Sequence, residues 1–444
     1  MQHLSPVLIV GVVFLATFVS TLGSSVSVGD GSFTTKHFGV PPSHAPLIVG
    51  FYLSGSAPGP LVVGPMSERY GRRLAIWSGT AILTAFATAS AAAPSWSTFL
   101  AFRLLAGFGS AASMVVAGGI VADVVPDAGV RGNLLSWLMV NNTLGSTFGT
   151  MVSTAVAKRW PDQWNAAYWL NGGAAGLSLV LLLCLPKSRK HDGSGTHDEN
   201  ATTAHAQALE LKLTRQFQLT LPLRMLFLEP IVSFACLSMS AAQSTYYLLF
   251  EFLPPTFSLL YEWTLDSNHK IFAPLVAGAV LAGITFTVLD PKIQVWVEKS
   301  ADQQRALDSR RLPGAGIGGV LIVMSLFLMG YAVSTHKPAA VILLAEGIFG
   351  FGFLLLYMCL TNYVADTYKI WIASAMAPLF LFRNLAGAAV NFAATPIWKS
   401  LGPSWTYLVL GFMIIPFAML LCWSYLFAPW LRQHSKFGIT LAAD

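Results

Sequence analysis

The sequence contains little charge. Lys, Arg, Asp and Glu make up 10% of its 444 residues, whereas hydrophobic residues make up 55%. A soluble domain carries about 25% charged residues, so this chain has too few to cover a surface that faces water. Together with a mean hydropathy of +0.62, the composition predicts a protein that lies in a lipid bilayer. Its long apolar runs do not alternate with polar residues, which favours helical spans over a closed barrel.

The sequence also lacks the motifs of common enzymes. It contains no GxSxG, HExxH or paired aspartate motif, and no Gly-Lys pair that a phosphate-binding loop would need. Eight of the nine histidines fall outside the predicted spans, and the ninth, His44, is the first residue of the second span. We therefore expect neither an enzyme nor an ATP-driven pump, and we expect no cofactor and no metal site. The cysteines stand singly in apolar runs, without metal or disulfide spacing: Cys184, Cys236, Cys359 and Cys422.

Twelve apolar runs are each long enough to cross a hydrocarbon core of about 30 Å. We expect an all-α polytopic membrane protein with twelve transmembrane helices in two pseudo-symmetric six-helix bundles. The first run has no basic segment before it, so it is interpreted as a span and not as a signal peptide. The predicted spans are 6–28, 44–66, 74–93, 97–123, 132–157, 165–186, 227–260, 271–290, 314–334, 339–365, 371–397 and 404–430.

A polar stretch divides the spans into two sets of six. We expect an N-terminal bundle over 1–186, a cytoplasmic linker over 187–224, and a C-terminal bundle with a short cytoplasmic tail over 225–444. The fourth span of each set ends with the same three residues, Val-Ala-Asp, at 121–123 and 364–366. Such internal repeats are typical of secondary transporters.

The distribution of basic residues predicts the orientation. With the N-terminus in the cytoplasm, eighteen of the 26 Lys and Arg residues fall in cytoplasmic segments and six in outer connections, while Arg103 and Arg383 lie inside spans. Positive charge concentrates in cytoplasmic loops, so both termini are expected inside. This distribution also accounts for the net charge of +6 without a nucleic-acid partner.

The connection between the second and third spans has the sequence GPMSERYGRR, from Gly64 to Arg73. Its glycines permit a tight reversal of the chain. Its arginines can pair with carboxylates at neighbouring helix ends or with helix C-terminal dipoles. The alternative is that they are ordinary positive residues of a cytoplasmic loop.

This connection resembles the signature loop of the major facilitator superfamily, and GPLVVGPMSERYGRR is similar to the fungal twelve-helix drug:proton antiporter branch. The similarity extends to PLRMLFLEPIV, GIFGFGF, TNYVADTY and FRNLAGA. It implies two bundles, a central cavity and alternating access. The chain departs from the branch at Ser146 and Thr150, where prolines are expected, and at the end of the first span, which carries Asp30.

The resemblance also implies a cytoplasmic charge latch that stabilises one conformation and breaks when the bundles rock. The interaction of such a latch is worth a few kcal/mol, enough to switch between two states. A purely structural role in folding is the alternative. The predicted latch residues are Gly64, Glu68, Arg69, Gly71, Arg72, Arg73, Asp123, Arg131 and Asp366.

Three charged residues inside spans are predicted to take part in proton coupling: Arg103, Glu251 and Glu346. A charge inside a span costs at least about 2.5–3.5 kcal/mol on insertion scales, so it usually faces a cavity or a partner. The resemblance links Arg103 to coupling, although it could instead reach towards the outer boundary. Apolar surroundings favour the protonated form of a carboxylate such as Glu251, for which a structural hydrogen bond is the alternative.

Polar and aromatic residues near the middle of the spans are predicted to line a substrate cavity. Walls of mixed aromatic and amide character suit bulky organic solutes. Packing, or anchoring at the membrane interface, is the alternative for each of them. The predicted cavity residues are Asn141, Asn142, Gln243, Tyr246, Tyr247, Phe250, Arg383 and Asn391.

The sequence thus predicts a secondary active transporter, with proton-coupled efflux of a drug, toxin or secondary metabolite as the first hypothesis. Uptake of a nutrient or organic acid is the second, and a sensor or relic without transport activity is the third. We expect a monomer in the plasma membrane, with the vacuolar membrane as the alternative. Its expected partners are a small-molecule substrate, protons and the lipid bilayer.

Overall fold

The computed structural model describes residues 6–29, 31–125, 128–185, 221–263, 267–298, 311–368 and 372–433. These residues form helices joined by short turns, with no strand among them, as predicted. Asp30 and most of the predicted linker lie outside the described residues.

The first half of the chain forms one group of packed helices. Helix α1 contacts α6, α7 and α8, while α5 packs against α6 and α8, and α3 packs against α6. Two short elements, α2 (Gly31–His37) and η1 (Pro42–His44), connect α1 to α3. The long helices are α1 (Pro6–Ser25), α3 (Ala45–Ser56), α4 (Gly59–Tyr70), α5 (Arg72–Ala91), α6 (Trp96–Val124), α7 (Ala128–Arg159) and α8 (Ala166–Cys184).

The second half forms a similar group. Helix α14 packs against α15 and α16, α12 packs against α15, and α11 packs against α16. Inside α16, Gly402 has φ 70° and ψ 172°, which divides this element into two helices. Glycine adopts this positive φ without a steric penalty. The helices are α10 (Leu221–Leu228), α11 (Pro230–Tyr261), α12 (Asn268–Glu298), α14 (Leu312–Ser334), α15 (Ala339–Thr367) and α16 (Ile372–Gln433).

Nine stretches of the described residues are long and apolar enough to cross a membrane. The two helices of α16 count as one of these stretches. Helices α7 and α11, with 32 residues each, are not among the nine. Both carry polar side chains, and some of these, such as Asn142 and Gln243, line a cavity inside the protein. The count of twelve spans therefore stays a prediction.

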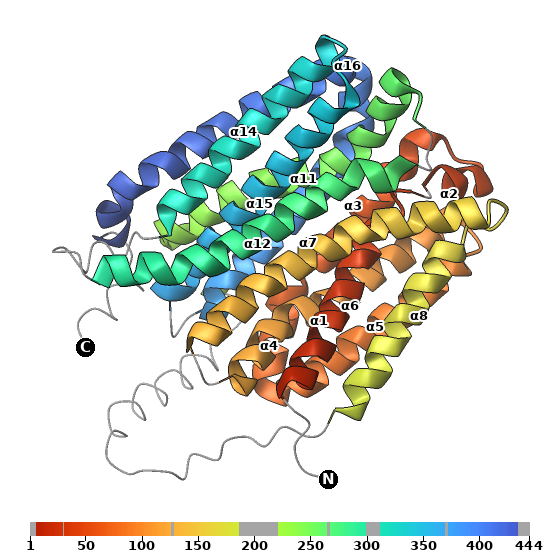
Figure 1. Cartoon of the computed structure of the whole chain (residues 1–444). Coiled ribbons are helices and arrows are strands. Elements are labelled where there is room, and N and C mark those ends of the chain that lie inside the picture. Colours follow the sequence, from red (N-terminus) through yellow and green to blue (C-terminus); the bar gives the residue numbers. More distant parts are fainter. Residues whose placement is uncertain are drawn as a thin grey trace.

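The two halves lie side by side along their helices (Figure 1), with α7 against α12 and with α3 and α4 against α16. Two hydrogen bonds join the halves near opposite ends of the helices. Thr395 Oγ1 donates to the Ser43 carbonyl oxygen at 2.8 Å, and Asn362 Nδ2 donates to Ser136 Oγ at 3.3 Å. In the predicted topology the first bond lies at the outer end and the second at the cytoplasmic end.

Close packing of α3 and α6 depends on two glycines. A Cβ atom added to Gly55 would lie 1.8 Å from the Leu104 carbonyl oxygen, and one added to Gly107 would lie 2.0 Å from the Tyr52 carbonyl oxygen. Helices in lipid associate through such small residues because lipid offers no hydrophobic driving force between them.

We expect Gly107→Ala to destabilise the fold, because the added methyl group would push α6 away from the backbone of α3. The measurement is the melting temperature and the monodisperse yield of the purified protein in detergent. Gly173→Ala is the matched control, since a Cβ atom there meets nothing within 4 Å. Equal stability of the two variants would show that the α3–α6 contact is not needed.

Candidate functional site

A cavity lies between the two halves, midway along the helices. It contains about 550 Å³ of space, counting the part that is open. Helices α1, α3, α6 and α7 contribute from the first half, and α11, α15 and α16 from the second. The lining residues are Ser20, Thr21, Ser24, Tyr52, Leu53, Ser56, Ser110, Met114, Met139, Asn142, Thr143, Ser146, Gln243, Tyr246, Tyr247, Phe353, Leu354, Tyr357, Arg383 and Asn384.

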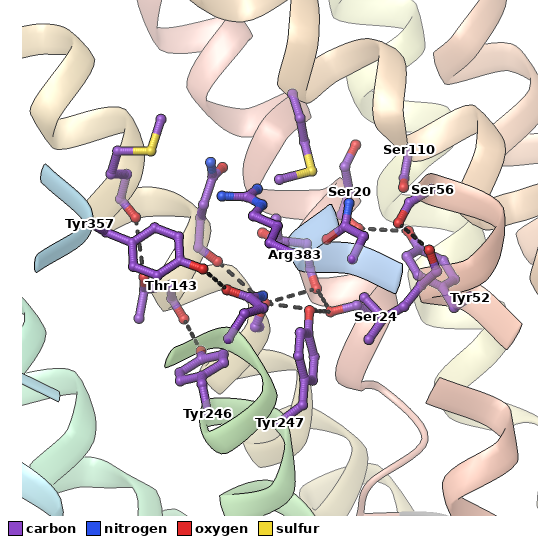
Figure 2. Close-up of a pocket in the computed structure, with 18 of the residues that line it drawn as sticks. Ser20, Ser24, Tyr52, Ser56, Ser110, Thr143, Tyr246, Tyr247, Tyr357 and Arg383 are labelled. Carbon is purple, nitrogen blue, oxygen red and sulfur yellow. Dashed lines mark hydrogen bonds between the residues drawn. The ribbon is translucent and has the colours of Figure 1, made fainter. Parts of the chain in front are cut away.

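Tyrosines of α11 join the two halves across this cavity (Figure 2). Tyr246 donates to the Thr143 carbonyl oxygen at 3.2 Å, and Tyr247 donates to Ser24 Oγ at 3.3 Å. The Tyr246 ring stacks on Phe353 with the ring centroids 4.6 Å apart. Aromatic surface and hydrogen-bonding groups therefore occupy the same wall. Separation of the halves would break the two hydrogen bonds that join them in this wall.

Arg383 is the only charged residue that lines the cavity within the described part of the chain. Its side chain is buried, and its guanidinium lies over Phe380, with Cζ 4.2 Å from the ring centroid. The Tyr357 ring is 5.7 Å from the same atom. Nε has no hydrogen-bond partner among the described residues. A full positive charge thus lies in the wall without a carboxylate beside it.

Five of the eight residues predicted from the sequence line this cavity: Asn142, Gln243, Tyr246, Tyr247 and Arg383. They come from α7, α11 and α16, which lie far apart in the sequence.

The other three predicted cavity residues lie outside its lining. Asn141 points towards α1, where its Nδ2 atom donates to Thr17 Oγ1 at 2.8 Å. Asn391 is buried and donates to the carbonyl oxygen of Gly387, one turn earlier in α16. Phe250 packs edge-on against the ring of Tyr246.

Sequence reasoning missed the hydroxyl side chains of the first half. They occur in apolar helices, where a lone serine or threonine is easily taken for a packing residue. Their recurrence in α1 at 20, 21 and 24 was the available signal, because residues spaced three and four apart share a helix face.

Arg103 lies behind the cavity, inside the first half. It is fully buried, and its Nη2 atom donates to the Gly23 carbonyl oxygen at 2.7 Å. Its Cζ atom is 4.6 Å from the ring centroid of Tyr52, which lines the cavity. Full burial is incompatible with a side chain that extends to the outer boundary. Arg103 instead connects α6 to α1 and α3.

The two acids predicted to take part in proton coupling lie outside the cavity lining. Glu251 is half-buried in α11. Glu346 is fully buried in α15, and neither of its carboxylate oxygens has a hydrogen-bond partner among the described residues. The nearby Tyr407 hydroxyl lies 2.8 Å from Thr256 Oγ1, which ties α11 to α16 at this level. An ionised carboxylate without a partner is costly in such surroundings, so the neutral form is favoured.

At the predicted latch, Arg72 and Asp123 form an ion pair with Nη1 and Oδ2 3.2 Å apart. The pair connects the start of α5 to the end of α6, within the first half. Both side chains are substantially exposed, so the pair alone contributes little to stability.

Arg73 has a different partner from Arg72. Its Nη2 atom donates to the Leu185 carbonyl oxygen at 2.6 Å, and its Cζ atom lies 4.2 Å from the Trp77 ring centroid. The end of α8 carries unsatisfied carbonyl groups and partial negative charge, which a guanidinium stabilises. Arg73 therefore joins α5 to α8.

The remaining predicted latch residues of the first half are placed as follows. Gly71 has φ 94°, which the turn between α4 and α5 requires and which favours glycine. Arg69 is exposed, with Cζ 5.3 Å from the Tyr70 ring centroid. Gly64 lies within α4, and Arg131 lies in the first turn of α7. Glu68 belongs to α4, but its side chain is outside what the structure describes.

The second half contains an equivalent of this ion pair. Arg311 Nε lies 2.9 Å from Asp366 Oδ2, and Arg311 Nη2 lies 3.7 Å from Asp290 Oδ2. Arg311 directly precedes α14 as Arg72 begins α5. Arg311 was not among the predicted residues. The repeated Val-Ala-Asp was the available signal, because it marks Asp366 as the equivalent of Asp123. An arginine at the start of α14, the equivalent of α5, could have been expected from it.

Two groups of helices that enclose a polar cavity at their interface define a multi-pass membrane transporter of the two-bundle class. The family model described as "Major Facilitator Superfamily" matches residues 13–391. The chain therefore belongs to this family. Members of the family are transporters and not enzymes.

Curated fungal relatives confirm the resemblance to the efflux branch. "MFS-type efflux pump MFS2" of Trichophyton rubrum is 28% identical over 440 residues, which cover 96% of this chain and 73% of the relative. "Efflux pump FUBT" of Fusarium oxysporum is 27% identical over 422 residues, covering 91% and 70%. "MFS transporter cpaT" of Aspergillus oryzae is 26% identical, covering 97% and 88%.

Solved structures confirm the fold. The xylose transporter XylE from E. coli, in a partially occluded inward-open conformation, superimposes with a TM-score of 0.67 at 18% identity, covering 94% of this chain and 98% of that one. A D-xylose-proton symporter gives a TM-score of 0.66 at 18% identity, covering 93% and 96%.

We expect Arg311→Gln to lower the melting temperature in detergent by several degrees, and by more than Arg72→Gln does. Arg311 is 10% exposed and faces two carboxylates, whereas Arg72 is 38% exposed and faces one. Removing one member of a more buried pair leaves charge without compensation. Lys270→Gln, at an exposed position, is the control for loss of one positive charge. A larger effect at Arg72 would contradict this ranking.

Proposed function

We propose that this protein is a secondary active transporter that exports small organic molecules in exchange for protons by alternating access. The observation that carries the proposal is the cavity whose walls come from both halves, with hydrogen bonds from Tyr246 and Tyr247 across it. When the halves rock, the hydrogen bonds near one end break while those near the other persist, and the cavity changes the side to which it opens.

The direction of transport is proposed from the relatives. Two of the fungal proteins described above carry the words "efflux pump" in their names. Uptake is the alternative, and the name "D-xylose-proton symporter" of a protein with the same fold supports it. A sensor or relic without transport activity is a third reading, motivated by Ser146 and Thr150 in place of prolines.

Proton coupling is proposed for Glu251 and Glu346. Both lie within spans and neither lines the cavity, so each could bind a proton without contact with the substrate. Glu346 has the more secluded environment, between α11, α15 and α16. Its protonation removes the cost of a buried charge, and its deprotonation requires that the second half rearrange to give it a partner or water.

The two ion pairs at the cytoplasmic ends are proposed to hold one conformation. Arg72–Asp123 and Arg311–Asp366 occupy equivalent places in the two halves. Each joins helices of a single half, so each sets the shape of its own bundle. Loss of either pair should change the rate of interconversion more than the amount of folded protein.

The proposed setting is a monomer in the plasma membrane, with the vacuolar membrane as the alternative and both termini in the cytoplasm. The cytoplasmic bias of Lys and Arg supports this orientation.

We expect Glu251→Gln and Glu346→Gln each to reduce substrate-dependent proton flux at least tenfold, since a glutamine cannot bind and release a proton. The measurement uses the purified chain in vesicles that contain a pH-sensitive dye, with a panel of neutral, anionic and cationic organic compounds. Glu262→Gln, at an exposed position after α11, is the control. Full flux in both variants would exclude these residues, and no flux from the unmodified protein would favour the third reading.

We expect a covalent link across the outer end to stop transport. The pair Ser43→Cys and Thr395→Cys replaces residues that already meet there, and a short bis-methanethiosulfonate reagent should join the two thiols through reducible disulfide bonds. The measurement is transport before linking, after linking and after reduction. The controls are the unmodified protein, which has its own four cysteines, and each of the two single substitutions. If the linked protein transports at the original rate, the halves do not separate at this end.

A further inference from the structure

The electrical character of the cavity limits what it can bind. Its lining contains one full charge, on Arg383, and no Asp or Glu within the described residues. The groups that act on Arg383 electrostatically are the phenols of Tyr357 and Tyr247, which are neutral. A cationic ligand would therefore meet repulsion at the centre of the site without a carboxylate to compensate for it.

Arg383 is held in place so that it can act on a ligand. Its Cζ atom lies 4.2 Å from the Phe380 ring centroid, and Nε is buried with no hydrogen-bond partner among the described residues. In Figure 2 the side chain lies between Tyr357 on one side and Ser20 and Ser24 on the other. A buried guanidinium with an unused N–H donor lacks a hydrogen-bond acceptor. An anionic oxygen can accept this hydrogen bond and also neutralise the positive charge.

The hydroxyl groups around Arg383 already donate their protons within their own helices. Ser20 donates to Ala16, Ser24 to Thr21, Ser56 to Leu53 and Ser110 to Gly107, each to a backbone carbonyl oxygen at 2.6–2.9 Å. Each of these hydroxyl oxygens has two lone pairs, and Ser24 Oγ uses one of them to accept from Tyr247, so acceptor capacity remains for a ligand. Across the cavity, Asn142 Oδ1 is an acceptor without a partner among the described residues. The wall therefore suits hydroxyl or N–H groups on a ligand.

The remaining surface is apolar and aromatic. Phe353 stacks on Tyr246, and Leu53, Leu354, Met114 and Met139 complete the lining. Flat or compact hydrocarbon groups bury well against such surfaces.

We propose that the substrates of this site are organic anions, specifically carboxylic acids with an aromatic or alicyclic body that carries hydroxyl or amine donors. The acid group binds the Arg383 guanidinium, the body lies between Tyr246 and Phe353 on one side and the aliphatic residues on the other, and the donors reach the serine oxygens and Asn142. This inference rests on the proposed function, because it names the substrate class of the same cavity.

The test measures binding alone, so it does not depend on transport or proton coupling. Purified protein in detergent is titrated with 6-hydroxy-2-naphthoate, with the corresponding uncharged amide, and with 6-hydroxy-2-naphthylmethylammonium. Binding is followed by calorimetry or by the shift in melting temperature. We expect the acid to bind at least tenfold more tightly than the amide and the cation to bind most weakly. An amide or a cation that binds as tightly as the acid would overturn the proposal, even if the protein transports.

Variants then assign the preference to Arg383. We expect Arg383→Gln to remove the tenfold preference for the acid over the amide, and Arg383→Lys to keep part of it. Lys399→Gln, which removes a positive charge from an exposed position on the same helix, should leave the preference unchanged. The ratio of acid to amide affinity would not change if Arg383 only supported the fold. A preference that survives in Arg383→Gln would overturn the assignment.

Discussion

Hydrocarbon offers no hydrogen-bond partners, and the arrangement of this protein depends on that constraint. Each helix satisfies its own backbone, and hydroxyl side chains inside the spans return to the same helix. Thr17 donates to the Val13 carbonyl oxygen and Thr80 to that of Ile76, each four residues earlier. Polar residues can therefore occupy α1, α5 and α7 without disturbing them. Serines in the cavity wall, such as Ser20 and Ser56, donate in the same way and keep oxygen lone pairs that a ligand can use. The hydrogen bonds that the fold requires thus leave a binding surface.

The lack of hydrogen-bond partners in hydrocarbon affects charged side chains more strongly, because burial of a charge costs more free energy than burial of a neutral polar group. Arg103 and Arg383 are buried close to aromatic rings, Arg103 also donates to the Gly23 carbonyl oxygen, and neither forms an ion pair with a carboxylate in the described part of the chain. Aromatic faces attract a guanidinium, but they do not cancel its charge. Arg103 faces the interior of the first half, whereas Arg383 faces the cavity. The pairs Arg72–Asp123 and Arg311–Asp366 lie at the helix ends, where water can hydrate the charges.

The helices were predictable because lipid selects long apolar runs, and the family resemblance predicted that Arg72 and Asp123 belong to one site. What the sequence could not predict is the direction in which each side chain points. Asn141 and Asn142 are adjacent, yet Asn141 binds α1 while Asn142 faces the cavity. Depth within a span is visible in a sequence, whereas rotation about the helix axis depends on packing. Glycines such as Gly107 set that packing, and hydropathy does not record it.

The isolated charge of Arg383 has an electrical consequence. An empty cavity is positive, whereas a cavity that holds an anion is neutral. A membrane potential does work of about 2.3 kcal/mol on each elementary charge per 100 mV. With a negative interior, the voltage favours the empty carrier when its positive cavity is open to the cytoplasm, which is the side where an exporter must load. In the proposed export of an anion, the loaded and neutral carrier turns outward without opposition from the field, and the anion is released to the side that attracts it.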